Sequence, residues 1–148
     1  MIDIKIIIQQ FNLFPHPEGG HYTRTYFDEH ARFSSILYAL EKGDFSSFHR
    51  IQQDEQWNFY LGNAIVIHEI NEHGNYKTTN LSLTTQLQYV VVAGNWFAVT
   101  AHGDLDFSFC GCTVIPTFTF VTFELATCKK LTAAFSQHAD IIQQLTRS

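Results

Sequence analysis

Short runs in which apolar and polar residues alternate cover most of the chain, and turn-forming Gly, Asn and Asp residues separate them. This pattern is typical of β-strands that bury one face. It predicts strands over residues 21–27, 34–40, 64–70, 88–92, 96–101, 107–115 and 118–125, with a shorter one over 81–85. The polar stretch 71–80 contains His73-Gly74-Asn75, which is predicted to be a hairpin tip.

The two ends of the chain follow a helical pattern instead. Apolar residues at Ile4, Ile7, Ile8 and Phe11 share one helical face, and Ser136 is a suitable N-cap for a second helix. Many short strands between two short helices predict an all-β sandwich or barrel, formed by residues 1–148 as one domain.

Residues 43–62, GDFSSFHRIQQDEQWNFYLG, are predicted to form a hairpin of two strands. His49 lies on the first strand with Ile51 on the same face, and Glu55 starts the return strand with Trp57 and Phe59 on its face. An antiparallel return would bring Glu55 beside His49. A base and an acid would then meet within an aromatic wall, which is a common composition for a small-molecule site.

Two neighbouring features leave alternatives open. The segment PHPEGG, residues 15–20, is either a rigid connection or the lip of a site with His16 or Glu18 turned inward. Arg24, in the following strand, is either a solvated charge at a sheet edge or an anion clamp inside a pocket.

Composition and charge narrow the range of functions. The chain has 148 residues, 45% of them hydrophobic, with a net charge of −5 and no run of Lys or Arg, so nucleic acid is not an expected partner. No apolar run approaches the ~20 residues of a membrane span, and no signal peptide is recognisable, so we expect a cytoplasmic protein. The cysteines, Cys110, Cys112 and Cys128, are odd in number, so a disulfide framework is not expected. Cys110-Gly111-Cys112 is either a metal or redox pair or, the interpretation that we favour, two small apolar residues packed on or beside a strand.

The spacing of Gly43, His49, Glu55 and Gly62 resembles the first signature of the cupin superfamily. A subgroup of small, single-domain cupins of largely unknown function is similar over nearly the whole chain. The segments that carry this resemblance are PHPEGG at 15–20, DEQW at 54–57, AGNW at 93–96, GCTV at 111–114 followed by Pro116, and FELA at 123–126.

The resemblance implies a jelly-roll barrel with an internal pocket, assembled as a homodimer. Related folds include sugar-nucleotide 3,5-epimerases, seed storage proteins and metal-dependent oxygenases, so fold alone does not select a function. Metal-binding cupins supply four ligands, but here Ile51 and Phe97 occupy two of those positions. Only His49 and Glu55 remain, which implies at most a weakly bound divalent metal and no firm cofactor.

These observations predict a site with His49 and Glu55 as catalytic residues. Glu18, Arg24 and Tyr38 are predicted to contact polar groups of a ligand. The apolar walls are assigned to Trp57, Phe59, Trp96 and Phe97, with core packing as the alternative for Phe59. Three functions stay open: an isomerase or epimerase acting on a carbohydrate-like substrate, a metal-dependent cupin enzyme with a reduced ligand set, and a ligand-binding or storage-type cupin without enzymatic activity.

Overall fold

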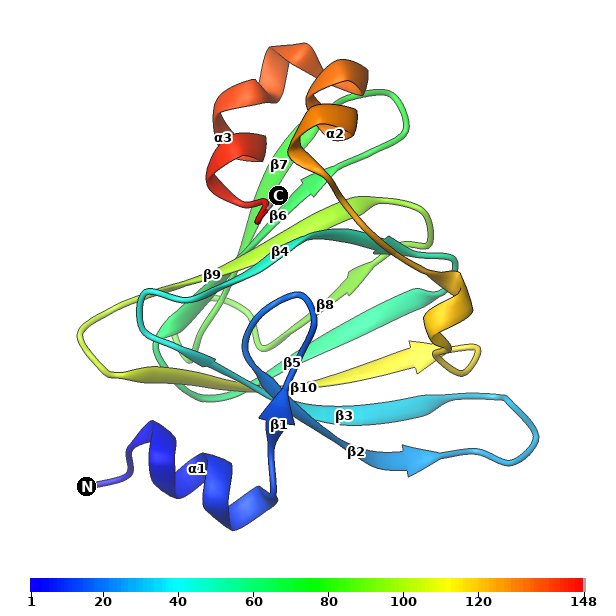
Figure 1. Cartoon of the computed structure of the whole chain (residues 1–148). Helices are drawn as coiled ribbons and strands as arrows, with labels where there is room; N and C mark the ends of the chain where they lie inside the picture. The colour runs from blue at the N-terminus through cyan, green and yellow to red at the C-terminus, as the bar shows by residue number, and fades with distance from the viewer. Residues whose placement is uncertain (148) are drawn as a thin grey trace.

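The computed structural model describes residues 1–147, which form two antiparallel β-sheets facing each other, with short helices outside (Figure 1). The first sheet has the strand order β1-β2-β3-β10-β5-β8 and the second β11-β4-β9-β6-β7. The strands are β1 Phe14–Pro15, β2 His21–Phe27, β3 Ser34–Glu41, β4 Phe45–Ile51, β5 Asp54–Gly62, β6 Ala64–Ile70, β7 Tyr76–Leu81, β8 Gln88–Val91, β9 Trp96–His102, β10 Phe107–Ile115 and β11 Phe123–Leu125. The helices are α1 Ile4–Phe11, α2 Cys128–Ala134 and α3 Ala139–Gln144, with 3-10 turns at Phe120–Thr122 and Ser136–His138.

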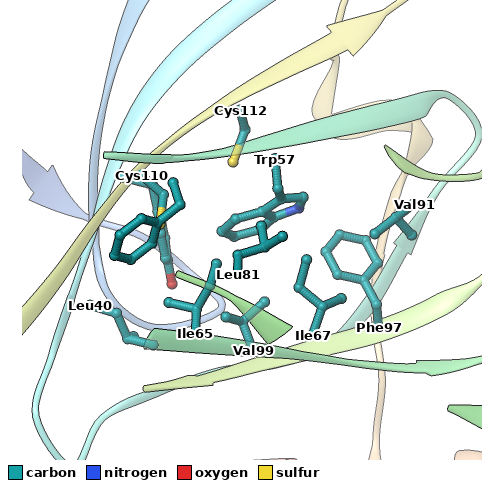
Figure 2. Packing of buried hydrophobic residues seen from close by; sticks show 12 residues of the cluster. Leu40, Trp57, Ile65, Ile67, Leu81, Val91, Phe97, Val99, Cys110 and Cys112 are labelled. Carbon is teal, nitrogen blue, oxygen red and sulfur yellow. The ribbon is translucent and has the colours of Figure 1, made fainter. Parts of the chain in front are cut away.

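Side chains from the two sheets interdigitate to form the interior (Figure 2). Trp57 of β5 and Cys112 of β10 point toward Ile67 of β6 and toward Phe97 and Val99 of β9. Each of these side chains is almost fully buried. Facing sheets with alternating inward residues are the expected solution for strands that are apolar on one face.

The helices cover the outer faces of both sheets. Asp3 caps α1 by accepting a hydrogen bond from the backbone N–H of Ile6, and Ile4 and Ile7 pack against Ala39, Phe107 and Phe109 on the first sheet. On the second sheet, α2 and α3 cover the apolar patch that includes Phe48, Ile70, Trp96 and Ala98 (Figure 1). None of the helices among residues 1–147 is long and apolar enough to cross a membrane.

The largest correction to the predicted strands concerns residues 43–62. β4 and β5 do not pair with each other, because β4 pairs with β9 and β11 whereas β5 pairs with β10 and β8. The connection at Gln52-Gln53 carries the chain from one sheet to the other instead of turning it back within one. His49 and Glu55 therefore face each other from opposite walls of the sandwich.

Three smaller predictions were also wrong. The strand expected at 81–85 is Tyr76–Leu81, because the chain pairs along β6 directly after the turn at residues 71–75. That turn contains His73-Gly74-Asn75, so the predicted hairpin tip is confirmed. Of the strand expected at 118–125, only Phe123–Leu125 is extended, and a 3-10 turn precedes it. The final helix begins at Ala139, after a 3-10 turn at Ser136, and α2, capped by the Thr127 side chain, was not predicted.

Candidate functional site

One end of the sandwich interior is hollow rather than packed. A cavity of about 500 Å³ lies there, within the size range of small-molecule sites. Its lining comes from the segment before β2, from both sheets, and from the segment that leads into β11. The residues are Phe14, His16, Glu18, Tyr22, Thr23, Arg24, Ser34, Ile36, His49, Ile51, Glu55, Cys112, Val114, Phe118, Phe120 and Phe123.

The pairing register of the first sheet explains which of its residues face the cavity. Arg24, Ile36 and Cys112 form one row across β2, β3 and β10, and Trp57 of β5 continues it. Two residues along β5, Glu55 lies in the next inward-facing row. Because residues two apart point to the same face of a strand, the two rows together form one wall.

The second sheet supplies the opposite wall through β4 and β11. His49 and Ile51 point inward from β4, and Phe123 of β11 lies in register with Ile51. The imidazole of His49 packs on the ring of Phe97, with the two centroids 4.1 Å apart, and lies 5.5 Å from the ring of Phe123. Aromatic rings therefore fix the imidazole plane from two sides.

Residues 16–20 form a tight loop that carries Glu18 into the cavity. The backbone N–H of His16 donates to the carbonyl of Gly20, and that of Gly19 donates to the carbonyl of His16. Gly19 has a φ of 112°, and a Cβ atom there would collide with the carbonyl oxygen of Phe45. A glycine is required at this position, so the loop prediction from PHPEGG has a steric cause.

Side chains from three other segments hold this loop in place. The Tyr38 hydroxyl donates to the carbonyl of Gly19 at 2.7 Å, and the backbone N–H of Gly20 donates to the Asp44 carboxylate at 3.0 Å. The Arg147 guanidinium, which follows α3, donates to the carbonyl of Glu18 at 2.5 Å and to the Asp44 carboxylate at 2.6 Å. The backbone that carries Glu18 is therefore fixed by residues far from it in sequence.

Glu18 forms a buried ion pair with His49. The Nε2 atom of His49 lies 3.0 Å from a carboxylate oxygen of Glu18, and both side chains are more than nine-tenths buried. The Nδ1 atom lies 2.7 Å from the carbonyl of Ser47, and since a carbonyl only accepts, Nδ1 carries a proton. The short contact at Nε2 needs a second proton, so the geometry matches an imidazolium beside a carboxylate.

Electrostatics in the cavity agree with this assignment. Burial opposes charge on both partners. Nevertheless, the facing charge and hydrogen bond of Glu18 hold the pKa of His49 above its usual value, and those of His49 hold the pKa of Glu18 below its own. Desolvation dominates for His16 and lowers its pKa, which leaves that ring neutral.

Glu55 is the carboxyl group of the cavity that has no tight ionic partner. Burial raises its pKa to about 7, although the nearby charge of His49 acts in the opposite direction. It therefore changes its protonation state near neutral pH, as a group that both takes up and releases a proton must. His16 complements it, because its Nδ1 atom accepts from the backbone N–H of Glu18 at 3.2 Å and the proton is left on Nε2.

The structure brings Glu18, Arg24, His49 and Glu55 together around the cavity. The expectation that His49 and Glu55 face one interior space holds, although the hairpin that we expected to join them does not exist. His16, for which the sequence left two interpretations, also lines the cavity.

The other predicted ligand contacts lie outside the cavity lining. Trp57 and Phe59 are packed in the interior, and Phe97 supports the His49 ring from beneath. The Tyr38 hydroxyl donates a hydrogen bond to the carbonyl of Gly19 in the loop. Trp96 lies on the outer face of the second sheet, because it is one residue out of phase with Phe97 and points the opposite way.

Several cavity residues were not predicted from the sequence. Phe118, Phe120 and Phe123 form the aromatic side of the cavity, with Phe118 and Phe120 packed edge to face. The closely spaced phenylalanines after Pro116 could have indicated an aromatic cavity lining, but their alternation was interpreted as a strand. Arg147 had no local signal, since its partners lie about a hundred residues earlier in the sequence.

The side chains of the cavity do not fit a bound metal ion. Both ring nitrogens of His49 are engaged, with Ser47 and Glu18, so neither offers a free lone pair. Ile51 and Phe97 have no donor atoms. Within residues 1–147, no three His, Cys, Asp or Glu side chains are grouped in a way that would hold a metal.

Comparison with known proteins identifies the architecture. Residues 5–126 match the family described as Cupin superfamily (DUF985). The crystal structure of protein SO0799 from Shewanella oneidensis is similar over 99% of both chains, with 35% sequence identity and a TM-score of 0.93. A hypothetical protein from Leishmania major has 24% identity and a TM-score of 0.92, covering 99% of this chain and 100% of the other.

More distant structures share the fold alone. Oxalate decarboxylase from Bacillus subtilis has 12% identity and a TM-score of 0.63, covering 88% of this chain and 36% of the decarboxylase. No curated protein matches the sequence. The predicted all-β cupin sandwich with short terminal helices is thereby confirmed.

Proposed function

This chain belongs to the DUF985 family of the cupin superfamily, and from that premise we propose that its cavity binds a small molecule and catalyses proton transfer on it. The reaction class is that of an isomerase or epimerase acting on a carbohydrate-like hydroxycarbonyl compound. The observation that carries the proposal is the position of Glu55, a buried carboxyl group without an ionic partner that faces the same cavity as a buried imidazolium–carboxylate pair.

Each ionisable group has a distinct part in the proposed reaction. The carboxylate of Glu55 takes the proton from the carbon next to the substrate carbonyl, and the electron pair of that C–H bond moves onto the carbonyl oxygen. The Nε2–H of His16 donates a hydrogen bond to this oxygen. The positive charge of His49, fixed by Glu18, stabilises the negative charge that develops. Glu55 then returns the proton to the former carbonyl carbon. The proton of the neighbouring hydroxyl passes through the His16 Nε2 position to the former carbonyl oxygen, so that the C=O bond re-forms at the hydroxyl-bearing carbon and the isomerisation is complete.

This division of labour refines the prediction that His49 is itself the acid or base. Because both its nitrogens are already bonded, His49 serves the reaction through its charge, while Glu55 moves the proton. The aromatic side of the cavity keeps water away from the reacting carbon, which strengthens these electrostatic effects. The substrate class is chosen because the sequence resembles a superfamily that includes sugar-nucleotide 3,5-epimerases.

Deuterium exchange tests the proposal without knowledge of the natural substrate. Fructose 6-phosphate, ribose 5-phosphate and their unphosphorylated sugars are incubated with the protein in D2O, and the loss of the C–H signal beside the carbonyl is followed by proton NMR. We expect exchange with the wild-type protein and a loss of about 100-fold or more in Glu55→Gln. Glu41→Gln, which changes an exposed glutamate on β3, should exchange at the wild-type rate.

Two results would overturn the assignment. If none of the compounds exchanged, or if one bound to the cavity without exchanging, the cavity would be a binding site without this chemistry. If Glu55→Gln exchanged as fast as the parent, Glu55 would not be the base.

A further inference from the structure

The four arginines of the chain differ in whether a carboxylate pairs with the guanidinium. Three are paired with a carboxylate, namely Arg32 with Asp28, Arg50 with Glu124 and Arg147 with Asp44. Arg24 has no carboxylate partner within residues 1–147, and it is the arginine that lines the cavity. A guanidinium left without a counter-ion beside a small-molecule cavity is available to a ligand.

The position of Arg24 is defined although its side chain is exposed. Its guanidinium carbon lies 4.5 Å from the centroid of the Phe27 ring, a cation–π contact within β2. An exposed residue that also lines the cavity lies at the rim. Phe14 and Phe120, which are also exposed, belong to the same rim.

Arg24 and Glu55 lie at opposite sides of the first-sheet wall. The register places β2 three strands away from β5, in the order β2-β3-β10-β5. Three strand spacings of about 4.8 Å, with an offset of two residues, separate their backbones by about 16 Å along the sheet. Both side chains line the cavity between these strands, which leaves room for one compact molecule to touch both of them.

The carboxylates of the cavity do not neutralise Arg24. Glu18 is held by His49, and Glu55 lies on the far side of the wall. The site therefore has a cationic rim at Arg24 and a floor formed by Glu55 and the Glu18–His49 pair. The phenylalanines of the aromatic side lie between them.

We infer that the ligand is an anion: a small hydroxycarbonyl compound whose carboxylate or phosphate group is bound by Arg24 while its carbonyl end lies at Glu55. This inference rests on the proposed function for the orientation of the ligand. The planar guanidinium donates two parallel hydrogen bonds to either kind of anionic group. The anion at the rim would hold the molecule by its non-reacting end and so select its orientation at the floor.

Matched pairs of compounds test this inference. Fructose and fructose 6-phosphate, ribose and ribose 5-phosphate, and glucose and glucuronate are titrated by calorimetry into wild-type protein, Arg24→Ala and Arg50→Ala. We expect the wild type to bind at least one anionic member about tenfold more tightly than its neutral counterpart. The phosphate and carboxylate pairs show separately which anionic group is preferred.

The variants assign the preference to a residue. Arg24→Ala should lose the tenfold preference while it binds the neutral sugar as the parent does. Arg50→Ala, which removes an arginine from the outer face of the second sheet, should retain it. Because Arg24 is exposed and loses only a surface cation–π contact with Phe27, its replacement should change the unfolding temperature little, and such a result would exclude misfolding as the cause.

The outcomes separate this inference from the proposed function. Equal binding within every pair, a preference that survives in Arg24→Ala, or no binding of any compound would overturn the anion site. Anion-selective binding without deuterium exchange would instead uphold the anion site and overturn the proton-transfer chemistry. If wild-type protein and Arg24→Ala both exchanged neutral and anionic compounds equally fast, the proton-transfer chemistry would be upheld and the anion site overturned.

Discussion

The interior of this sandwich has two unlike halves that are built by the same strands. In the packed half, Trp57, Ile67 and Phe97 are almost completely buried and fill the space between the sheets. In the hollow half, Glu55 and His49 are also buried, yet they border a cavity of about 500 Å³. β5 contributes to both halves, with Glu55 and Trp57 only two residues apart on one face.

The difference between the halves shows how a β-sandwich combines stability with a site. Apolar burial in one half supplies the free energy that lets the other half remain open and charged. The loop at 16–20, which carries Glu18 into the hollow half, is held by hydrogen bonds from the side chains of Tyr38 and Arg147. We therefore expect substitutions in the packed half mainly to lower stability, and substitutions in the hollow half mainly to weaken ligand binding.

The largest expected effect is in the packed half. Trp57→Ala should lower the free energy of unfolding by about 3–5 kcal/mol, because it removes an almost fully buried ring and leaves a cavity behind. Phe120→Ala is the matched control, since its ring lies at the rim and is 53% exposed. It should cost less than about 1 kcal/mol while it weakens ligand binding. Urea unfolding of both variants checks this, and equal losses would contradict the division into halves.

The packed half was the easier one to predict from the sequence. Alternation located most strands and their inward faces, because residues two apart share an environment whichever strand is the partner. The alternation did not distinguish aromatic residues that pack in the core from those that line the cavity. Trp57 and Phe123 have the same kind of side chain, and only the pairing of distant strands decides which of them meets the cavity.

The charged residues of the hollow half were predicted from the sequence, but its aromatic lining and its geometry were not. The spacing of His49 and Glu55 identified both groups, yet the chain crosses between sheets at Gln52-Gln53, where a hairpin looked equally suitable. The partner of His49 is Glu18, about thirty residues earlier in the sequence, and local patterns do not report such contacts. Loop contacts of this kind are long-range consequences of the fold.

The second effect concerns pH and belongs to the hollow half. The Glu55 carboxyl has a pKa of about 7 in the folded chain, against an ordinary value of 4.5. The folded state therefore binds more protons than the unfolded state between these values, and stability falls as pH rises from about 4.5 to about 7. At pH 8 the cost is about 3 kcal/mol. Glu55→Gln should remove this cost, so that the variant becomes more stable than the parent at pH 8.

Urea unfolding at several pH values between 5 and 8 measures this difference. A slope of the same sign should persist in Glu55→Gln, because the raised pKa of His49 gives stability that is present below its ordinary value of 6.5 and is lost as pH rises through the folded value. The lowered pKa of Glu18 acts only below about pH 4.5, outside this window. Parallel curves for the parent and Glu55→Gln would show that Glu55 is not held protonated by the fold.

The smallest of the three effects tests what holds the loop at 16–20 in place. Arg147 donates to the carbonyls of Glu18 and Phe45 and to the Asp44 carboxylate, and its guanidinium carbon lies 3.9 Å from the centroid of the Phe45 ring. Because the side chain is 37% exposed, solvent screens its charge. Arg147→Ala should therefore lower the free energy of unfolding by only about 1–2 kcal/mol, through lost hydrogen bonds.

Its effect on the loop should be larger than its effect on the fold as a whole. The backbone N–H of Ser47 donates to the carbonyl of Glu18, so hydrogen exchange at Ser47 reports whether the loop stays docked. We expect faster exchange at Ser47 in Arg147→Ala, unchanged exchange at Ile67 in the packed half, and partial recovery in Arg147→Lys, which keeps the charge but not the forked geometry. Equal acceleration at both positions would mean that the two halves open together, and that the hollow half has no support of its own.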